Sequence, residues 1–197
     1  MIFRLGVTGG IGSGKSTVCK VFNVLGIPVF SADDEGHTVM ETDTGLKNDL
    51  NRLIGEDLYA TGELNRKKLA SIIFNDDSLL ERVNSLVHPR VYARYQLWCK
   101  QQRASYIIFE AAILFEAGAE DHVDKILAVL APLEERINRV MSRNRMTREQ
   151  VMERVNKQIK EEEMIKRSDY YINNSENTMI IPEVMKIHNS ILKYLEK

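Results

Sequence analysis

A glycine-rich segment near the start of the chain combines residue types that bind phosphate. Residues 9–16 read Gly-Gly-Ile-Gly-Ser-Gly-Lys-Ser and fit the pattern G-x-x-x-x-G-K-[ST]. Glycines at this spacing let successive backbone N–H groups face a phosphate, and the start of a following helix adds its positive dipole end. Lys15 is placed to reach the β- and γ-phosphates, and the Ser16 hydroxyl to complete a Mg²⁺ shell of water and phosphate oxygens. The segment predicts a nucleotide-phosphate site.

Asp33 is a second candidate for chemistry because it directly follows an apolar run at residues 28–32. A carboxylate at the carboxyl edge of a doubly wound sheet can orient an acceptor hydroxyl and take its proton during phosphoryl transfer. Residues 21–51 contain six acidic residues and a single Lys or Arg, Lys47, whereas a phosphate acceptor needs arginines to hold it. This composition favours a hydroxyl acceptor over a nucleoside monophosphate. The alternative, that Asp33 caps the following helix, stays open.

Phosphate loops of this kind also occur in switch GTPases and motor-like ATPases. A switch GTPase would carry Asp-x-x-Gly after its third strand, but residues 110–116 read Glu-Ala-Ala-Ile-Leu-Phe-Glu. Its second motif, Asn-Lys-x-Asp, is approached only by residues 156–159, which read Asn-Lys-Gln-Ile. A kinase is therefore favoured over a switch.

Residues 136–160 form a strongly basic segment with eight basic and two acidic residues. Arg136, Arg139 and Arg143 recur at spacings of three and four, which places them along one helix face. Arginines on a segment that folds over the phosphate site can stabilise charge on the transferred group. Arg139 and Arg143 are the first candidates. A solvated helix surface is the alternative for most of these residues, and a nucleic-acid site is disfavoured because interleaved aromatic residues are missing.

The elements that must position these residues follow a βαβ pattern. Apolar runs that predict strands lie at residues 2–8, 28–32, 106–110, 125–131 and 170–172. Helical patterns separate them, among them one at residues 15–25. The pattern predicts an α/β fold of the P-loop NTPase type, a five-stranded parallel sheet flanked by helices on both faces.

Two connections are long enough to form substructures of their own. Residues 36–103 are mostly helical in pattern and predict a substrate-binding lobe, with a helix that kinks or restarts at His88-Pro89. Residues 133–167 predict a helical lid, in which Thr147 and Gln150 match a capping box. The remaining core comprises residues 1–35, 104–132 and 168–197, so the chain is expected to be one kinase domain with an inserted lobe and a lid.

Composition supports an ordinary globular protein of 197 residues, with 44% apolar and 28% charged residues. A formal net charge of −1 gives no electrostatic bias toward nucleic acid or an anionic membrane. The two cysteines are far apart and are expected to be reduced. The richest apolar run, residues 106–119, is interrupted by two glutamates, and the N-terminus reaches its glycines too early for a signal peptide. We expect a cytoplasmic protein, and the sequence does not indicate its oligomeric state.

Taken together, these features resemble one family, the dephospho-CoA kinases, over nearly the whole chain. The matching segments are residues 5–17, Ala32-Asp33, His88-Pro89, residues 113–116, Arg139 with Arg143, Gln158 and residues 169–174. Ser31 stands where the family often has a further Asp, and Ala112 where it usually has proline. The resemblance implies ATP-dependent phosphorylation of the ribose 3′-hydroxyl of dephospho-CoA, the last step of CoA synthesis, with Mg²⁺ and no nucleic-acid or membrane partner.

The resemblance also implies roles for individual residues. Asp33 would orient the 3′-hydroxyl as a base, while Lys15 and Arg139 would stabilise the transferring phosphoryl group, with Arg143 in support. The residues implied to bind ATP are Gly12, Ser13, Gly14, Lys15, Ser16, Thr17, Arg143 and, near the adenine, Asn174. Those implied to border the acceptor are Asp33, His88, Leu114, Phe115 and Glu116.

Two of these assignments have alternatives, and one further residue is a candidate. His88 could equally be a core or capping histidine, and Glu116 could pair with a lid arginine to hold a closed state. Glu110, at the end of a predicted strand, could lie near the metal. Two rival functions also stay open, a P-loop kinase for a nucleoside or nucleotide and a nucleotide-binding regulatory module without turnover.

Overall fold

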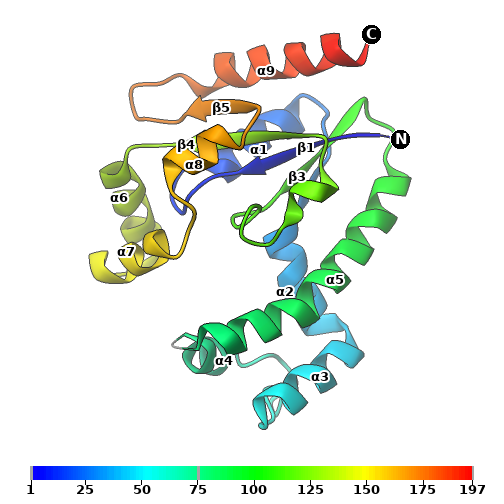
Figure 1. Cartoon of the computed structure of the whole chain (residues 1–197), viewed down its shortest axis with the longest axis vertical. Coiled ribbons are helices and arrows are strands. Elements are labelled where there is room, and N and C mark those ends of the chain that lie inside the picture. Colours follow the sequence, from blue (N-terminus) through cyan, green and yellow to red (C-terminus); the bar gives the residue numbers. More distant parts are fainter. Residues whose placement is uncertain (1, 75, 197) are drawn as a thin grey trace. The chain divides into compact units, whose positions relative to one another are not determined.

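The computed structural model describes residues 2–74 and 76–196 and divides into two compact units (Figure 1). The first unit comprises the residues up to Ser31 together with those from Gln102 onward, and the second comprises Ala32–Gln101. The first unit contains the sheet and the basic segment, and the second is entirely helical where it has regular structure.

The sheet of the first unit has five parallel strands. They are β1 (Phe3–Thr8), β2 (Val29–Ser31), β3 (Tyr106–Glu110), β4 (Lys125–Leu130) and β5 (Tyr170–Asn173). Their order is β2-β3-β1-β4-β5, so the first strand lies in the middle of the sheet. Each lies within one or two residues of its predicted position, which confirms the predicted α/β fold and its parallel sheet.

One face of the sheet is covered by α1 (Lys15–Val24) and α9 (Ile180–Leu195). Leu5 and Val7, two residues apart on β1, point to this face and are completely buried. Phe22 of α1 and Val184 of α9 pack into the same apolar cluster. Burial of this cluster removes large apolar side chains from water and fixes where α1, and hence the loop before it, begins.

The basic segment folds as a helical hairpin of α6 (Leu133–Asn144) and α7 (Arg148–Asn156), followed by the short α8 (Glu161–Lys166). The predicted capping box is confirmed, because the Thr147 side chain accepts from the Gln150 backbone N–H while the Gln150 side chain accepts from the Thr147 N–H. The two helices bury a small apolar cluster, here named the hairpin core, which consists of Ile137, Val140 and Val151.

The second unit contains α2 (Ala32–Thr42), α3 (Thr44–Ile54), α4 (Arg66–Ile73) and α5 (Asp77–Gln101). The alternative that a helix restarts at His88-Pro89 is wrong, because α5 runs through Pro89 and bends along its length (Figure 1). Proline removes one backbone donor from this turn. In the same turn, the Arg90 side chain donates from Nη1 to the Leu86 carbonyl oxygen at 2.7 Å.

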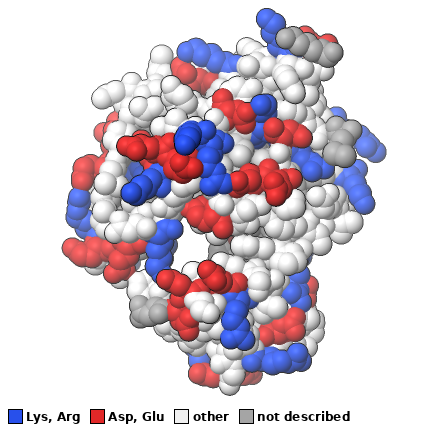
Figure 2. Space-filling view, in the orientation of Figure 1, with Lys and Arg blue, Asp and Glu red and all other residues white. Residues whose placement is uncertain are grey.

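The acid-rich stretch of α2 and α3 is largely ion-paired within its own unit. Arg90 lies 2.7 Å from Asp49 and 3.5 Å from Asp43, and Arg94 lies 2.5 Å from Glu35. Figure 2 shows acidic and basic side chains interspersed on the visible face. The local excess of acid in the sequence is thus not an excess of unpaired negative charge, because α5 supplies arginines that lie far away along the chain.

Within residues 2–74 and 76–196, none of the helices is both long and apolar enough to span a membrane.

Candidate functional site

The phosphate loop, residues 9–14, joins the end of β1 to the start of α1. Gly12 and Gly14 have φ angles of +79° and +92°, in the left-handed region that favours glycine. A Cβ atom at Gly12 would lie 2.4 Å from the Arg136 carbonyl oxygen, and one at Gly14 would lie 2.0 Å from Nδ2 of Asn174. The glycines are therefore required both by the backbone turn and by neighbours that approach the loop closely.

Lys15 opens α1 and is only 9% exposed. Its Nζ donates a hydrogen bond to the Gly9 carbonyl oxygen at 2.8 Å, so the ammonium folds back over the loop that it follows. Ser16 and Thr17, the next two residues of the same turn, are exposed. The hydroxyls of this first turn are thus accessible beside a helix N-terminus, the arrangement that suits an anion and its metal ion.

Glu110 ends β3 and is in register with Val7 of β1 and Ser31 of β2. Burial raises the pKa of the Cys19 thiol, the Glu110 charge raises this pKa further, and the Lys15 charge opposes both. Because β1 and β3 are parallel and Glu110 is opposite Val7, Glu110 lies at the edge of the sheet where the phosphate loop leaves β1 and leads to Lys15. A carboxylate there can serve an oxygen-preferring cation such as Mg²⁺.

Asn174 and Arg139 are brought together beside the phosphate loop. The Asn174 side chain donates from Nδ2 to the Ser13 carbonyl oxygen at 2.8 Å. Arg139 donates to the Asn174 carbonyl oxygen at 3.0 Å and to a Glu135 carboxylate oxygen at 2.8 Å. Arg143, in contrast, is exposed and donates to the side chain of the neighbouring Asn144.

Arg136, which sequence reasoning ranked behind the other two arginines, is the one of the three whose side chain bonds to the loop. Its Nε donates to the Ile11 carbonyl oxygen at 3.0 Å. Gln158, which carried no assigned role, accepts from the Ile11 backbone N–H at 2.8 Å. The helical spacing placed Arg136 on the same face as Arg139 and Arg143 but could not show which of the three contacts the loop. No spacing pattern in the sequence indicated that Gln158 contacts the loop.

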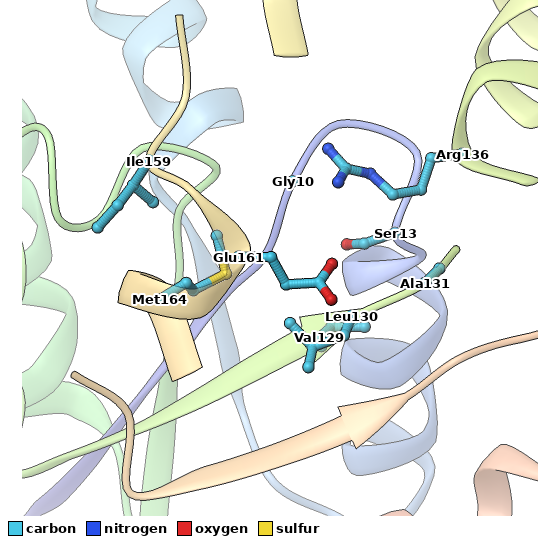
Figure 3. A pocket seen from close by; sticks show the side chains of 9 residues that line it. All are labelled: Gly10, Ser13, Val129, Leu130, Ala131, Arg136, Ile159, Glu161 and Met164. Atoms are coloured by element: carbon cyan, nitrogen blue, oxygen red, sulfur yellow. The ribbon is translucent and has the colours of Figure 1, made fainter. Parts of the chain in front are cut away.

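A small cavity of about 20 Å³ lies behind the loop (Figure 3). Its lining residues are Gly10, Ser13, Val129, Leu130, Ala131, Arg136, Ile159, Glu161 and Met164. Burial lowers the pKa of the Arg136 guanidinium, and the Glu161 charge opposes this shift. The volume fits about one water molecule, so this cavity is too small for a nucleotide base.

The segment after β3 carries three of the predicted acceptor residues. Leu114 is completely buried and Phe115 is 6% exposed, with the Arg167 guanidinium 4.4 Å from the centre of its ring. Glu116 is exposed, and its carboxylate accepts from the Ile159 backbone N–H at 2.9 Å. Glu116 thus bonds to the segment after the hairpin through a backbone group.

Two predicted residues belong to the second unit. Asp33 is exposed in the first turn of α2, two residues beyond the end of β2. Its carboxylate lies at the N-terminal end of α2, where negative charge suits the helix dipole, so a role at the helix start stays an alternative to the catalytic one. His88 is partly buried within α5, where burial lowers its pKa, and its ring lies in an edge-to-face arrangement with that of Tyr92, with 6.5 Å between the ring centres.

In the described part of the chain, His, Cys, Asp and Glu side chains do not gather in threes around a possible metal position. A phosphate-loop enzyme does not need such a cluster, because phosphate oxygens and water supply most of the Mg²⁺ ligands. The exposed Ser16 hydroxyl and the Glu110 carboxylate are oxygen donors of the type that the ion prefers. The residues present therefore fit a magnesium ion that arrives with the nucleotide.

Comparison with known proteins decides the family. The model of the family described as dephospho-CoA kinase matches residues 3–179. The chain belongs to the dephospho-CoA kinase family. A dephospho-CoA kinase from Bacteroides fragilis is 37% identical over 188 residues, which cover 95% of this chain and 92% of that protein.

Solved structures agree with this assignment. A crystal structure of a Thermus thermophilus protein has a TM-score of 0.88 and 33% identity, and covers 97% of this chain and 98% of its own. The dephospho-CoA kinase from Campylobacter jejuni has a TM-score of 0.69 and 27% identity, with 98% of both chains covered. The predictions of the family and of a P-loop kinase enzyme are confirmed, and membership implies ATP as co-substrate.

Proposed function

We propose that this chain transfers the γ-phosphoryl group of ATP to the ribose 3′-hydroxyl of dephospho-CoA, giving CoA and ADP in the final step of CoA biosynthesis. The observation that carries the proposal is the phosphate loop between β1 and α1, in a chain whose residues 3–179 match the dephospho-CoA kinase family. ATP and dephospho-CoA are the proposed substrates, and the cytoplasm, where thiols such as buried Cys19 stay reduced, is the proposed location.

The loop and the first turn of α1 are proposed to hold the ATP phosphates. These residues are Gly12, Ser13, Gly14, Lys15, Ser16 and Thr17, with Asn174 and Arg143 as further ATP contacts. The Lys15 ammonium exchanges the Gly9 carbonyl for phosphate oxygens, which are stronger charge-assisted acceptors. Arg139 adds positive charge where negative charge develops on the transferred group. Ser16 and Glu110 are the residues that would hold Mg²⁺, and the ion would supply positive charge to neutralise the ATP phosphates.

Asp33 is the proposed base. Its carboxylate orients the 3′-hydroxyl and accepts its proton while the 3′-oxygen bonds to the γ-phosphorus, and the bond from that phosphorus to the bridging oxygen of ADP breaks. The proposed acceptor-bordering residues are His88, Leu114, Phe115 and Glu116.

Residues 36–103 are proposed as the CoA-binding lobe and residues 133–167 as the lid, on a core of residues 1–35, 104–132 and 168–197.

The test replaces Asp33 by asparagine, which keeps the size and removes the carboxylate. Asp34→Asn is the matched control, because Asp34 is the next exposed acid in the same turn of α2. We expect Asp33→Asn to lower kcat by roughly 10²- to 10⁴-fold, the scale of a positioned acid–base group. The Kd for ATP should stay unchanged, and Asp34→Asn should keep kcat near the wild-type value.

ADP release over a panel of acceptors tests the substrate. The proposal is refuted if dephospho-CoA yields no more ADP than enzyme and ATP alone. Turnover with a nucleoside monophosphate would indicate a different P-loop kinase. If none of the acceptors gives turnover, the chain would be a regulatory nucleotide-binding module. Equal kcat for Asp33→Asn and wild type would reduce Asp33 to a stabiliser of the first turn of α2.

A further inference from the structure

Ile11 lies in the middle of the phosphate loop and is held in three ways by side chains of residues 136–158. Its backbone N–H donates to Oε1 of Gln158 at 2.8 Å. Its carbonyl oxygen accepts from Nε of Arg136 at 3.0 Å. Its partly buried side chain packs against the hairpin core. Amide, carbonyl and side chain of this one residue therefore all depend on residues more than 120 positions away.

The other end of the Gln158 amide reaches the segment that follows β3. Nε2 of Gln158 donates to the Ala112 carbonyl oxygen at 3.4 Å. The next residue, Ile159, donates its backbone N–H to the Glu116 carboxylate at 2.9 Å. Residues 112–116 contain the proposed acceptor-bordering side chains. One partly buried glutamine thus connects the loop proposed to hold ATP with the segment proposed to border the acceptor.

We propose that Gln158 is a positioning residue that aligns the phosphate loop with residues 112–116. The inference rests on the proposed kinase function and adds a residue to it. A phosphate loop binds through several backbone N–H groups that face the ligand, so the loop backbone must keep its conformation. Because Gln158 holds the Ile11 amide and Arg136 holds its carbonyl, the Ile11 residue cannot turn its carbonyl dipole toward the phosphates.

The chemistry of a primary amide suits this position. The Gln158 carbonyl oxygen accepts from the Ile11 backbone N–H, and its NH₂ group donates to the Ala112 carbonyl oxygen. Ionised glutamate has acceptors only, so it can keep the bond to Ile11 but repels the Ala112 carbonyl. Alanine removes both bonds. Comparing the two variants therefore separates the effect of the bond to Ile11 from that of the bond to Ala112.

Both variants would be compared with wild type for the Kd of ATP, the KM of dephospho-CoA and kcat. We expect Gln158→Ala to weaken ATP binding about tenfold, because a lost hydrogen bond of about 1 to 1.5 kcal/mol corresponds to roughly that factor. It should also lower kcat. We expect Gln158→Glu to keep the Kd of ATP within about twofold of wild type and to raise the KM of dephospho-CoA or lower kcat.

Gln150→Ala is the matched control, because Gln150 lies eight residues before Gln158 and its side chain bonds to Thr147 in the α7 capping box instead of to the loop. It should lower Tm slightly and leave the Kd of ATP unchanged. The proposal is overturned if Gln158→Ala behaves like Gln150→Ala, with a lower Tm but unchanged ATP and acceptor constants. It is equally overturned if Gln158→Glu loses ATP affinity as fully as Gln158→Ala.

The two readouts also separate this inference from the proposed function. If wild type binds ATP but does not phosphorylate dephospho-CoA, the proposed function fails. The Kd of ATP in the three variants then still decides whether Gln158 positions the loop.

Discussion

Replacing Gly12 by alanine tests how closely the hairpin presses on the phosphate loop. Gly12 has a φ of +79°, and an added Cβ would lie 2.4 Å from the Arg136 carbonyl oxygen, a backbone atom of α6. Gly26, just beyond α1, has nearly the same φ of +81°, and an added Cβ there would meet none of the described atoms within 4 Å. The two substitutions thus share the backbone strain and differ in the steric contact.

The shared strain of placing alanine in the left-handed region costs about 1–2 kcal/mol. The steric overlap at Gly12 adds about 1–3 kcal/mol, the usual cost of overpacking, since a backbone carbonyl cannot rotate away as a side chain can. For a chain of this length 1 kcal/mol lowers Tm by roughly 2–4 °C. Gly12→Ala should therefore have a Tm about 2–12 °C below that of Gly26→Ala.

Thermal unfolding followed by circular dichroism measures the difference in Tm, and calorimetric titration with ATP measures the Kd. We expect ATP affinity to fall in Gly12→Ala, because relief of the overlap displaces the loop, and to persist in Gly26→Ala. Equal Tm and equal Kd for the two variants would show that α6 does not restrict the loop, and the packing argument would then be wrong.

Two further predictions concern pH and motion. Burial lowers the pKa of His88 and His188 below the ordinary value near 6.5, so the unfolded chain binds more protons than the folded one between the folded pKa and 6.5. The free energy of unfolding should therefore fall as pH drops from about 7 toward 5. Urea denaturation across this range measures it, and a weaker slope is expected after His88→Gln with His188→Gln; an unchanged slope would contradict the assignment. For the proposed lid, ATP plus acceptor should slow hydrogen exchange at residues 143–148, the free end of the hairpin. Unaltered exchange there would exclude closure.

Local patterns predicted most of the framework. The strands follow from short apolar runs, the phosphate loop from glycine spacing, and the start of α7 from the Thr147–Gln150 capping box. Each of these features is determined by residues that are close together in the sequence, so a short segment is enough to predict it.

Contacts between residues far apart in the sequence could not be predicted from local patterns. The bond between Ile11 and Gln158 joins positions 147 residues apart, and spacing within a helix could not show which arginine would meet the loop. From local composition alone, the acidic residues of α2 and α3 look unpaired. Their partners on α5, Arg90 and Arg94, come 41 or more positions later in the sequence.

The central place of β1 in the sheet has a consequence for biosynthesis on the ribosome. β1 is made well before its partners β3 and β4, which begin at Tyr106 and Lys125. At about 5–20 residues per second, roughly 5–20 s pass before these partners are translated. During that time Leu5 and Val7 are exposed apolar residues of an unpaired strand, so a nascent chain of this protein is a natural client for chaperones that cover such segments.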